Sequence, residues 1–175
     1  MDRIFISVFL LTIACVQGAA QGTSSVEWGE RITSADFEAS ATKNDTAAAN
    51  ISVSILLGYS YGGDGMLTFK VAAVMDKKES WIKDEFKDND EVLAHEQGHF
   101  DIAHIYARRL EASLKGKRYR RADVSILHEI YDTFLERMHE LQKRYDAETR
   151  GGMDARAQET WRKFIEKEVF AIQLP

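Results

Sequence analysis

The chain has 175 residues, carries 28 Asp and Glu against 23 Lys and Arg, and contains one cysteine. The acidic balance excludes a broad basic surface for nucleic acid, and one cysteine excludes an internal disulfide. The length that remains after the first twenty residues suits one domain with its own core.

The first twenty residues have the pattern of a secretory signal peptide. Arg3 precedes an apolar run over residues 4–16, and Gly18-Ala19-Ala20 supplies small residues for cleavage. The run is too short to span a bilayer comfortably, so we expect no transmembrane domain. Cleavage before Cys15 with lipid attached to it is an alternative. The sequence thus predicts a secreted or periplasmic protein, or a membrane-anchored lipoprotein, whose mature part is a single domain over residues 21–175.

Two runs with a period of two predict a hairpin of half-buried strands. In "ISVSILLGYSY" (51–61) and "MLTFKVAAVMD" (66–76), apolar residues alternate with other residues, many of them small or polar. The glycine-rich stretch 62–65 between them tolerates positive φ and suits the turn. A weaker strand is predicted at "VEWGERI" (26–32).

Three helices are predicted after the strands. Residues 88–115, 122–149 and 154–171 are rich in Leu, Ala, Glu, Arg and Lys and contain no proline, and glycine falls mainly between these segments. Strands followed by helices indicate an α+β fold, with a small N-terminal antiparallel or mixed sheet, and not alternating βαβ units.

A basic cluster, "LKGKRYRRAD" at 114–123, lies between the first two predicted helices. It is compatible with a phosphate or membrane patch. The interpretation that we favour from the sequence is a solvated turn whose cations lie at the C-terminal end of a helix, where the helix dipole stabilises them.

The stretch "LAHEQGHFDIAHIYARRL" (93–110) places two histidines four residues apart, with a glutamate directly after the first. At 100° per residue, His99 lies about 40° from His95, so both imidazoles project from one helical face and can share one ion. Glu96 lies about 100° away, where it can reach a water activated by that ion. This spacing suits a catalytic Zn²⁺ held by two imidazoles, with Glu96 as the general base.

The alternative is an ordinary amphipathic helix with histidines on a wet face. Here, however, the histidines share the apolar arc of the helix, where an unpartnered polar ring is costly. The apolar residues that flank them are Val92, Ala103, Tyr106 and Leu110. Gly98 costs about 1 kcal/mol of helix stability relative to alanine, which indicates that another group approaches the backbone there.

The third protein ligand is less defined by the sequence. His104 is nearest, but it projects about 180° from the pair, so we keep it as a reserve and expect a supporting or surface role. The stretch "QKRYDAET" near the end of the next helix is a better source. Asp146 can ligate the metal, and Tyr145 can hydrogen-bond a developing oxyanion, with a core tyrosine and a surface aspartate as the equally weighted alternative. Further reserves are His128, His139, Glu140 and Glu148.

Several stretches resemble the predicted secreted zinc-dependent proteases, an uncharacterised bacterial domain family of zincin-like character. They are "SWIKDEF" (80–86), "LAHEQGHFDIAHIYARRL" (93–110), "YDAET" (145–149) and "QETW" (158–161), which together with the strands span most of the mature chain. The resemblance implies a zincin-like core with His95 and His99 as ligands and Glu96 as base. This chain departs from the family pattern at Gly151, where the family has histidine, and at His104, where it often has glutamate. A weaker analogy to deuterolysin-like enzymes, which use an aspartate ligand, supports Asp146.

Three functions compete. The first is a secreted zinc metallopeptidase that holds a peptide substrate along a strand such as 66–76. The second is a catalytically inactive zincin-scaffold envelope protein that binds a partner, peptide or glycan; Gly151 favours it and the retained Glu96 opposes it. The third is a di-iron helical protein built on Glu96-x-x-His99 and Glu136-x-x-His139, which the predicted strands oppose because it needs four long helices. The tryptophans Trp28, Trp81 and Trp161 are expected in the core or a cleft wall.

Overall fold

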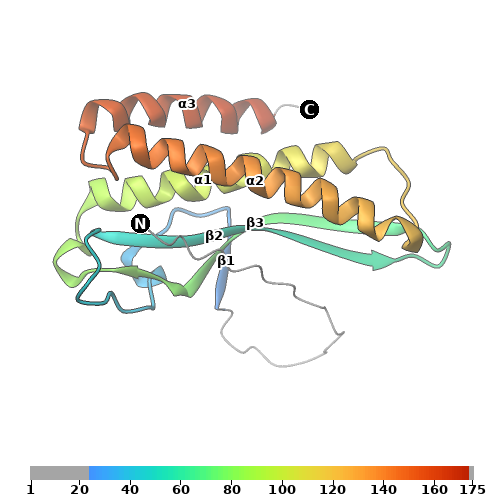
Figure 1. Ribbon diagram of the computed structural model, residues 1–175, viewed down its shortest axis with the longest axis horizontal. Helices are drawn as coiled ribbons and strands as arrows, with labels where there is room; N and C mark the ends of the chain where they lie inside the picture. The colour runs from blue at the N-terminus through green and yellow to red at the C-terminus, as the bar shows by residue number, and fades with distance from the viewer. Residues whose placement is uncertain (1–23, 174–175) are drawn as a thin grey trace.

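The computed structural model describes residues 24–173 (Figure 1). The predicted signal peptide and Cys15 lie outside these residues. Within them, no helix is both long enough and apolar enough to cross a bilayer.

The sheet has three antiparallel strands in the order β1-β3-β2. β1 spans Ser25–Glu27, β2 spans Ala49–Tyr61 and β3 spans Leu67–Ile82. The hairpin between β2 and β3 is confirmed, and Gly62 N donates to Met66 O at 2.8 Å across its turn. β3 runs six residues beyond the predicted end at 76 because its last residues pair with the start of β2.

Strand β3 is central, and β2 is an edge strand. β2 pairs along residues 67–76, where we predict that an extended peptide binds, and β1 pairs on the other side over Val74–Asp76, so no edge is free at those three residues. For the rest of the stretch the prediction stays a prediction. The register of β2 shifts between Asn50 and Ser52, which marks a bulge near its start.

Three helices follow, as predicted. α1 spans Asp90–Leu114, α2 spans Val124–Thr149 and α3 spans Ala155–Gln173. α1 starts where it does because the side chain of Asn89 caps it, accepting from Glu91 N and Val92 N. The α+β class with a small sheet and three helices is thus confirmed.

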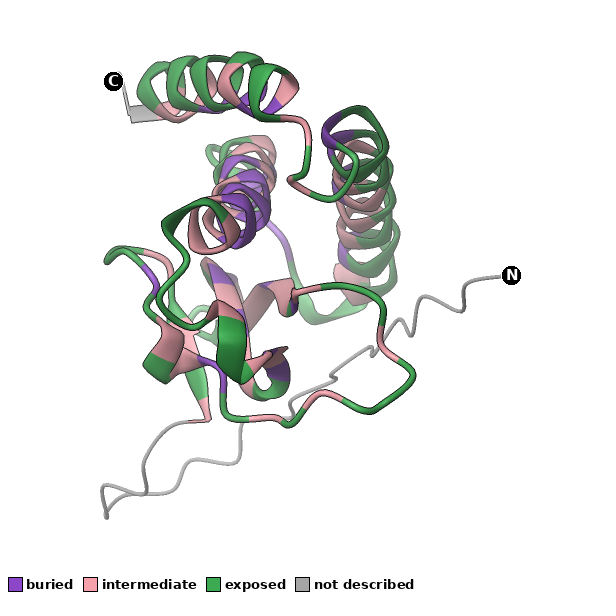
Figure 2. Ribbon diagram, turned by 90° about the vertical axis from the view of Figure 1, so that its left-hand side faces the viewer, coloured by how far each residue is buried: buried purple, intermediate pink, exposed green. Residues whose placement is uncertain are grey.

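All three helices lie on one side of the sheet (Figures 1 and 2). α1 packs directly on β2 and β3 and also contacts α2 and α3, so it has neighbours on several sides. Its buried face supplies much of the core, whose most deeply buried residues include Ile55, Met75, Phe100, Ile102, Ile105, Leu110, Leu127, Met138 and Tyr145. A helix surrounded in this way can present polar side chains to α2 and α3 within a largely dry interior.

The segment around β1 is attached to α1 by side-chain hydrogen bonds. Trp28 Nε1 donates to Asp101 Oδ1 at 2.7 Å, and Ile32 N donates to Gln97 Oε1 at 2.9 Å. Gln97 Nε2 also donates to Asp101 Oδ1, so one continuous network holds the N-terminal segment on the helix.

Candidate metal site

The first turns of α1 present His95, Glu96 and His99 on its buried side. Their residues are only 5 %, 5 % and 8 % exposed. The two imidazole rings lie edge to face with centroids 4.9 Å apart, so they point into one common region, as the 100° helical step predicted.

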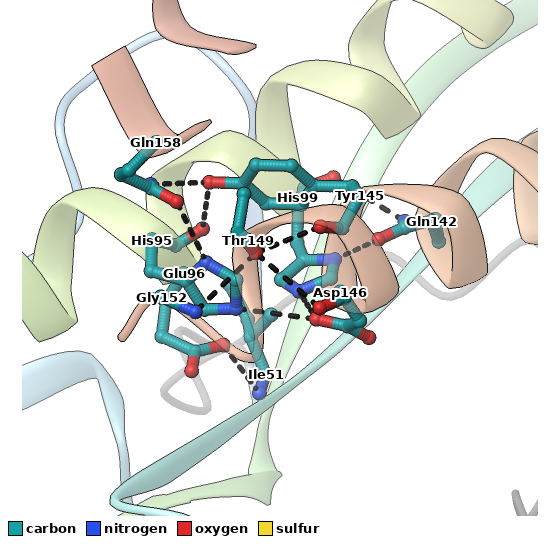
Figure 3. Close-up of polar contacts among 10 residues, drawn as sticks. All are labelled: Ile51, His95, Glu96, His99, Gln142, Tyr145, Asp146, Thr149, Gly152 and Gln158. Atoms are coloured by element: carbon teal, nitrogen blue, oxygen red, sulfur yellow. Dashed lines mark hydrogen bonds and ion pairs between the residues drawn. The ribbon is translucent and has the colours of Figure 1, made fainter. Parts of the chain in front are cut away.

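Asp146, near the end of α2, meets both histidines (Figure 3). One oxygen of its carboxylate, Oδ1, lies 3.2 Å from His95 Nε2 and 2.9 Å from His99 Nε2. Among the described residues, these three form a group whose ligand atoms all lie within 4.8 Å of one another. The Asp146 side chain is 52 % exposed while both rings are buried, so the cluster is open to solvent on the Asp146 side.

The other nitrogen of each ring faces a glutamine carbonyl oxygen. His95 Nδ1 lies 3.3 Å from Gln158 Oε1, and His99 Nδ1 contacts Gln142 Oε1. The orientation of both amides is fixed by their NH₂ groups. Gln142 Nε2 donates to the carbonyl oxygen of His99, and Gln158 Nε2 donates to the hydroxyl of Tyr145. Each Nδ1 must therefore carry a proton, which leaves each Nε2 directed at the Asp146 oxygen.

This arrangement requires positive charge between the rings and Asp146. A neutral ring with its proton on Nδ1 directs a lone pair from Nε2, and two such lone pairs would face a negative oxygen. Protons on both Nε2 atoms would relieve that repulsion but would place two imidazolium rings side by side in a buried site, which is costly. One proton on His99 Nε2, or a single divalent cation, meets the same requirement without a second buried imidazolium.

The pKa shifts in the cluster have the same origin. Burial by itself opposes the charged form of His99, but its hydrogen bond to Asp146 and the carboxylate charge outweigh burial and raise the pKa of His99. Burial would raise the pKa of Asp146, yet the hydrogen bonds from His95 and His99 hold that pKa well below its usual range. The aspartate is therefore an anion throughout the neutral range, as a metal ligand must be.

Glu96 lies beside the cluster but not within the ligand group. Its Oε2 accepts a hydrogen bond from Ile51 N at 3.1 Å, at the bulge of β2. Burial raises the pKa of Glu96, although the nearby histidines oppose the rise. The carboxylate therefore lies between the edge strand and the histidines, at the place where the two elements meet.

Tyr145 lies behind the histidines rather than on the open side. Its ring stacks on His95 at 4.7 Å, and its hydroxyl donates to the carbonyl oxygen of His95 at 3.3 Å while accepting from Gln158. The residue is only 1 % exposed. The predicted oxyanion role of Tyr145 does not fit this geometry, because the hydroxyl is fully engaged and directed at the backbone of α1.

Gly98 is the residue that allows Tyr145 to come so close. A Cβ at this position would lie 2.4 Å from the Tyr145 hydroxyl oxygen and 2.8 Å from Cζ. The prediction that another group approaches the helix backbone at Gly98 is therefore confirmed.

The turn between α2 and α3 closes over His95. Three consecutive residues, Arg150, Gly151 and Gly152, have positive φ values of 54°, 62° and 83°. A Cβ on Gly152 would meet His95 Cγ at 3.0 Å, so the backbone packs directly on the imidazole. By contrast, a Cβ on Gly151 would have no neighbour within 4 Å.

His104 lies apart from the cluster, as its helical angle predicted. Its ring stacks on Trp28 with centroids 3.6 Å apart and planes 10° from parallel. Burial, together with the positive charge of Arg108, lowers the pKa of His104 to about 4. His104 therefore packs the N-terminal segment and is not a ligand.

The remaining reserve residues also lie outside the ligand group. His128, Glu140 and Glu148 are exposed, and His139 is half-buried. The second E-x-x-H pair, Glu136 and His139, does not join Glu96 and His99, so the described residues do not form a di-iron site. Of the tryptophans, Trp161 is buried against Tyr145, and Trp28 and Trp81 are half-buried.

Sequence reasoning missed the roles of Gln142, Gln158 and Gly152. A signal existed for the first, because Gln142 precedes Asp146 by four residues and so shares its helical face. Gln158 stood in the "QETW" stretch without a role. Nothing local in the sequence indicates that Gly152 would contact His95.

The protein is therefore an α+β domain that carries a cluster of two histidines and an aspartate between its helices. The chain matches the model of a family described as bacterial protein of unknown function (DUF922) over residues 19–152, and it belongs to that family. The match includes His95, Glu96, His99 and Asp146 and ends before α3. No curated protein and no solved structure matches the chain.

Proposed function

We propose that this protein is a zinc metallopeptidase of zincin type, with His95, His99 and Asp146 as metal ligands and Glu96 as the general base. One observation carries the proposal: both Nε2 atoms lie at 2.9–3.2 Å from the same Asp146 oxygen, while both Nδ1 atoms are held by glutamine carbonyls. Export directed by residues 1–20 is part of the proposal.

The donor set fits zinc. Two neutral imidazoles and one carboxylate are three protein ligands of the kind found in catalytic zinc sites, which keep a further position open. The exposed side of Asp146 provides that access. The hydrogen bonds from each Nδ1 to Gln142 and Gln158 hold both rings in the tautomer that ligation requires.

When bound, zinc would supply a Lewis acid that polarises a peptide carbonyl and lowers the pKa of a water. Glu96 would accept the proton of the attacking water and return it to the leaving amine nitrogen. Its burial raises its pKa and so makes the carboxylate a better proton acceptor.

An extended peptide substrate would align with β2, the edge strand that touches Glu96 at Ile51. Edge strands bind extended peptides through main-chain hydrogen bonds. Tyr131 of α2 already donates to Ile55 O at 2.6 Å, so we place the substrate near the bulge, on the side of Ile55 where Glu96 lies.

The metal assignment is tested by elemental analysis of the purified protein after incubation with zinc. We expect about one zinc per chain in the unaltered protein and at least a hundredfold loss of affinity in His95→Ala and Asp146→Ala, because each removes one of three ligands. His104→Ala is the matched control and should keep its zinc. Metal content unchanged by His95→Ala would overturn the site.

The catalytic assignment is tested with Glu96→Gln, which keeps the shape of the side chain and removes its basicity. We expect cleavage of an unfolded protein substrate to fall by about 10²–10⁴-fold, with zinc content unchanged. Equal cleavage by Glu96→Gln and the unaltered protein would remove Glu96 as base.

A second function, an inactive envelope protein on the same scaffold, is favoured by the hydrogen bond from Ile51 N to Glu96. That bond gives the buried carboxylate a structural role in joining α1 to β2. Under this alternative the protein binds zinc but cleaves no peptide, and Glu96→Ala, which removes the acceptor for Ile51 N, lowers its thermal stability without any change in hydrolysis.

A further inference from the structure

A second surface of the protein combines strong positive charge with exposed apolar side chains. Five of the 23 cationic residues fall within residues 115–121, with no acidic residue among them, although the whole chain carries −5. All five are exposed. They are Lys115, Lys117, Arg118, Arg120 and Arg121, and we call this segment with its neighbours Tyr61 and Ile126 the basic tip.

The backbone of the basic tip is held by the hairpin between β2 and β3. Leu67 N donates to the carbonyl oxygen of Tyr119 at 2.9 Å, and Met66 forms a bridge with Arg120. Tyr119 itself is buried, with its ring against Phe69. The cations on either side of Tyr119 are therefore presented outward from an anchored loop at the end of the sheet and helices.

Charge in the basic tip is not neutralised locally. Within the part of the chain that the structure describes, only Arg118 has an acidic ion-pair partner, Asp64 at 3.5 Å. The guanidinium of Arg121 lies over the ring of Tyr61 instead, 5.6 Å from its centroid. A solvated turn explains exposed cations, but it does not explain large apolar groups beside them.

Two such apolar groups flank the cations. Tyr61, at the end of β2, is 48 % exposed, and Ile126, in the first turn of α2, is 49 % exposed. Tyrosine and aliphatic side chains next to clustered Lys and Arg are the combination that binds the interface of an anionic bilayer, where the rings and alkyl groups enter the headgroup region.

The basic tip and the metal cluster lie at opposite ends of α1 (Figure 1). The 16 residues from His99 to Lys115 correspond to about 24 Å along a helix. A surface that held the tip would therefore lie well away from the cluster.

We propose that the basic tip docks the protein on anionic lipid headgroups. The partner is a bilayer surface that carries negative charge, and the contact is peripheral, made by the five cations together with Tyr61 and Ile126. The exposed Tyr61 and Ile126 suit a bilayer interface, which takes up rings and alkyl groups, better than the phosphate backbone of a nucleic acid.

The proposal is tested by sedimentation of the full chain with phosphatidylcholine vesicles, with and without phosphatidylglycerol. The test variant is Lys115→Gln/Lys117→Gln/Arg118→Gln. The matched control, Lys78→Gln/Lys143→Gln/Lys167→Gln, loses the same charge from exposed positions elsewhere. Residues 1–23 are identical in all proteins, so any contribution that they make cancels between the variants.

We expect the unaltered protein to bind vesicles with phosphatidylglycerol more tightly than vesicles without it, and less tightly at roughly 0.5 M salt. The tip variant should lose about 100-fold in affinity, from about fivefold for each cation, and the control should lose far less. Because the changed residues are exposed, both variants should keep the thermal transition of the parent. Equal losses in the two variants, or tighter binding to duplex DNA than to vesicles at the same salt, would overturn the proposal.

Discussion

Helix α1 carries histidines in two environments that look alike in composition and differ in chemistry. At its N-terminal end, His95 is covered by the ring of Tyr145 at 4.7 Å. Five residues beyond His99, His104 is covered by the ring of Trp28 at 3.6 Å. An aromatic ring therefore stacks on a histidine at both places.

The difference lies in what the ring nitrogens meet. Those of His95 face Gln158 and Asp146, so the ring is held between two acceptors. His104 has Trp28 on its face and Arg108 as the charge that lowers its pKa, with no carboxylate in that role. Residue type and burial therefore do not distinguish a metal-ligating histidine from a histidine that only packs. A hydrogen-bond acceptor at each ring nitrogen does distinguish them.

We expect the greatest loss of stability from Gly98→Ala, which disturbs the packing of Tyr145 on His95. The new Cβ would lie 2.4 Å from the Tyr145 hydroxyl oxygen, so Tyr145 must move away from His95. We expect the free energy of unfolding to fall by roughly 3 kcal/mol in urea denaturation. The stacking of Trp28 on His104 should survive.

The control for this prediction is Gly63→Ala, where a Cβ has no neighbour within 4 Å and little change is expected. Adding Tyr145→Phe to Gly98→Ala removes the clashing oxygen and should restore part of the loss. A full loss of stability in the double variant would contradict the steric explanation.

An intermediate effect is expected from Gln158→Leu, which keeps the size of the side chain and removes the acceptor for His95 Nδ1. We expect zinc affinity, measured by competition with a chromogenic chelator, to fall by about 10–100-fold. Gln97→Leu is the matched control, because the Gln97 side chain forms hydrogen bonds with Ile32 and Asp101 instead of with His95. Equal losses of zinc affinity in both variants would show that the effect is one of general stability.

The helices, the hairpin and the shared face of His95 and His99 could be predicted because each follows from local periodicity. Period-two runs gave β2 and most of β3, and a step of 100° per residue placed the two imidazoles together and His104 apart. The end of β3 was missed, since it depends on pairing with the start of β2, a long-range contact.

The roles of neighbouring residues on α2 could not be predicted from the sequence. Tyr145 and Asp146 are adjacent, and their side chains diverge by about 100° around the helix. Which of them faces the open side is decided by how α2 packs on α1, and that packing depends on the absence of a side chain at Gly98. The contact of Gly152 with His95 likewise follows from three successive positive φ values, a property of the folded turn.

The smallest expected effect is the pH dependence that His104 contributes. Its folded pKa of about 4 lies below the ordinary value of 6.5, because burial and Arg108 disfavour the charged ring. Above pH 6.5 the ring is neutral in both the folded and the unfolded state, so it does not change the free energy of unfolding. As the pH falls from 6.5 toward 4, His104 is protonated in the unfolded chain but not in the folded protein, so the free energy of unfolding decreases.

His104→Phe should remove this loss, because phenylalanine keeps an aromatic ring against Trp28 and has no proton to bind. At pH values near 7 the variant and the parent should differ by a constant amount. Near pH 5 the variant should gain about 1 kcal/mol more relative to the parent, a figure reduced for the partial solvent exposure of the ring. Urea denaturation at the two pH values measures this difference, and contributions from the other histidines cancel because both proteins contain them. If the variant and the parent differed in free energy of unfolding by the same amount at both pH values, His104 would be protonated as easily in the folded protein as in the unfolded chain. Only the hydrogen-bond partners of His95 and His99 would then distinguish these histidines from His104.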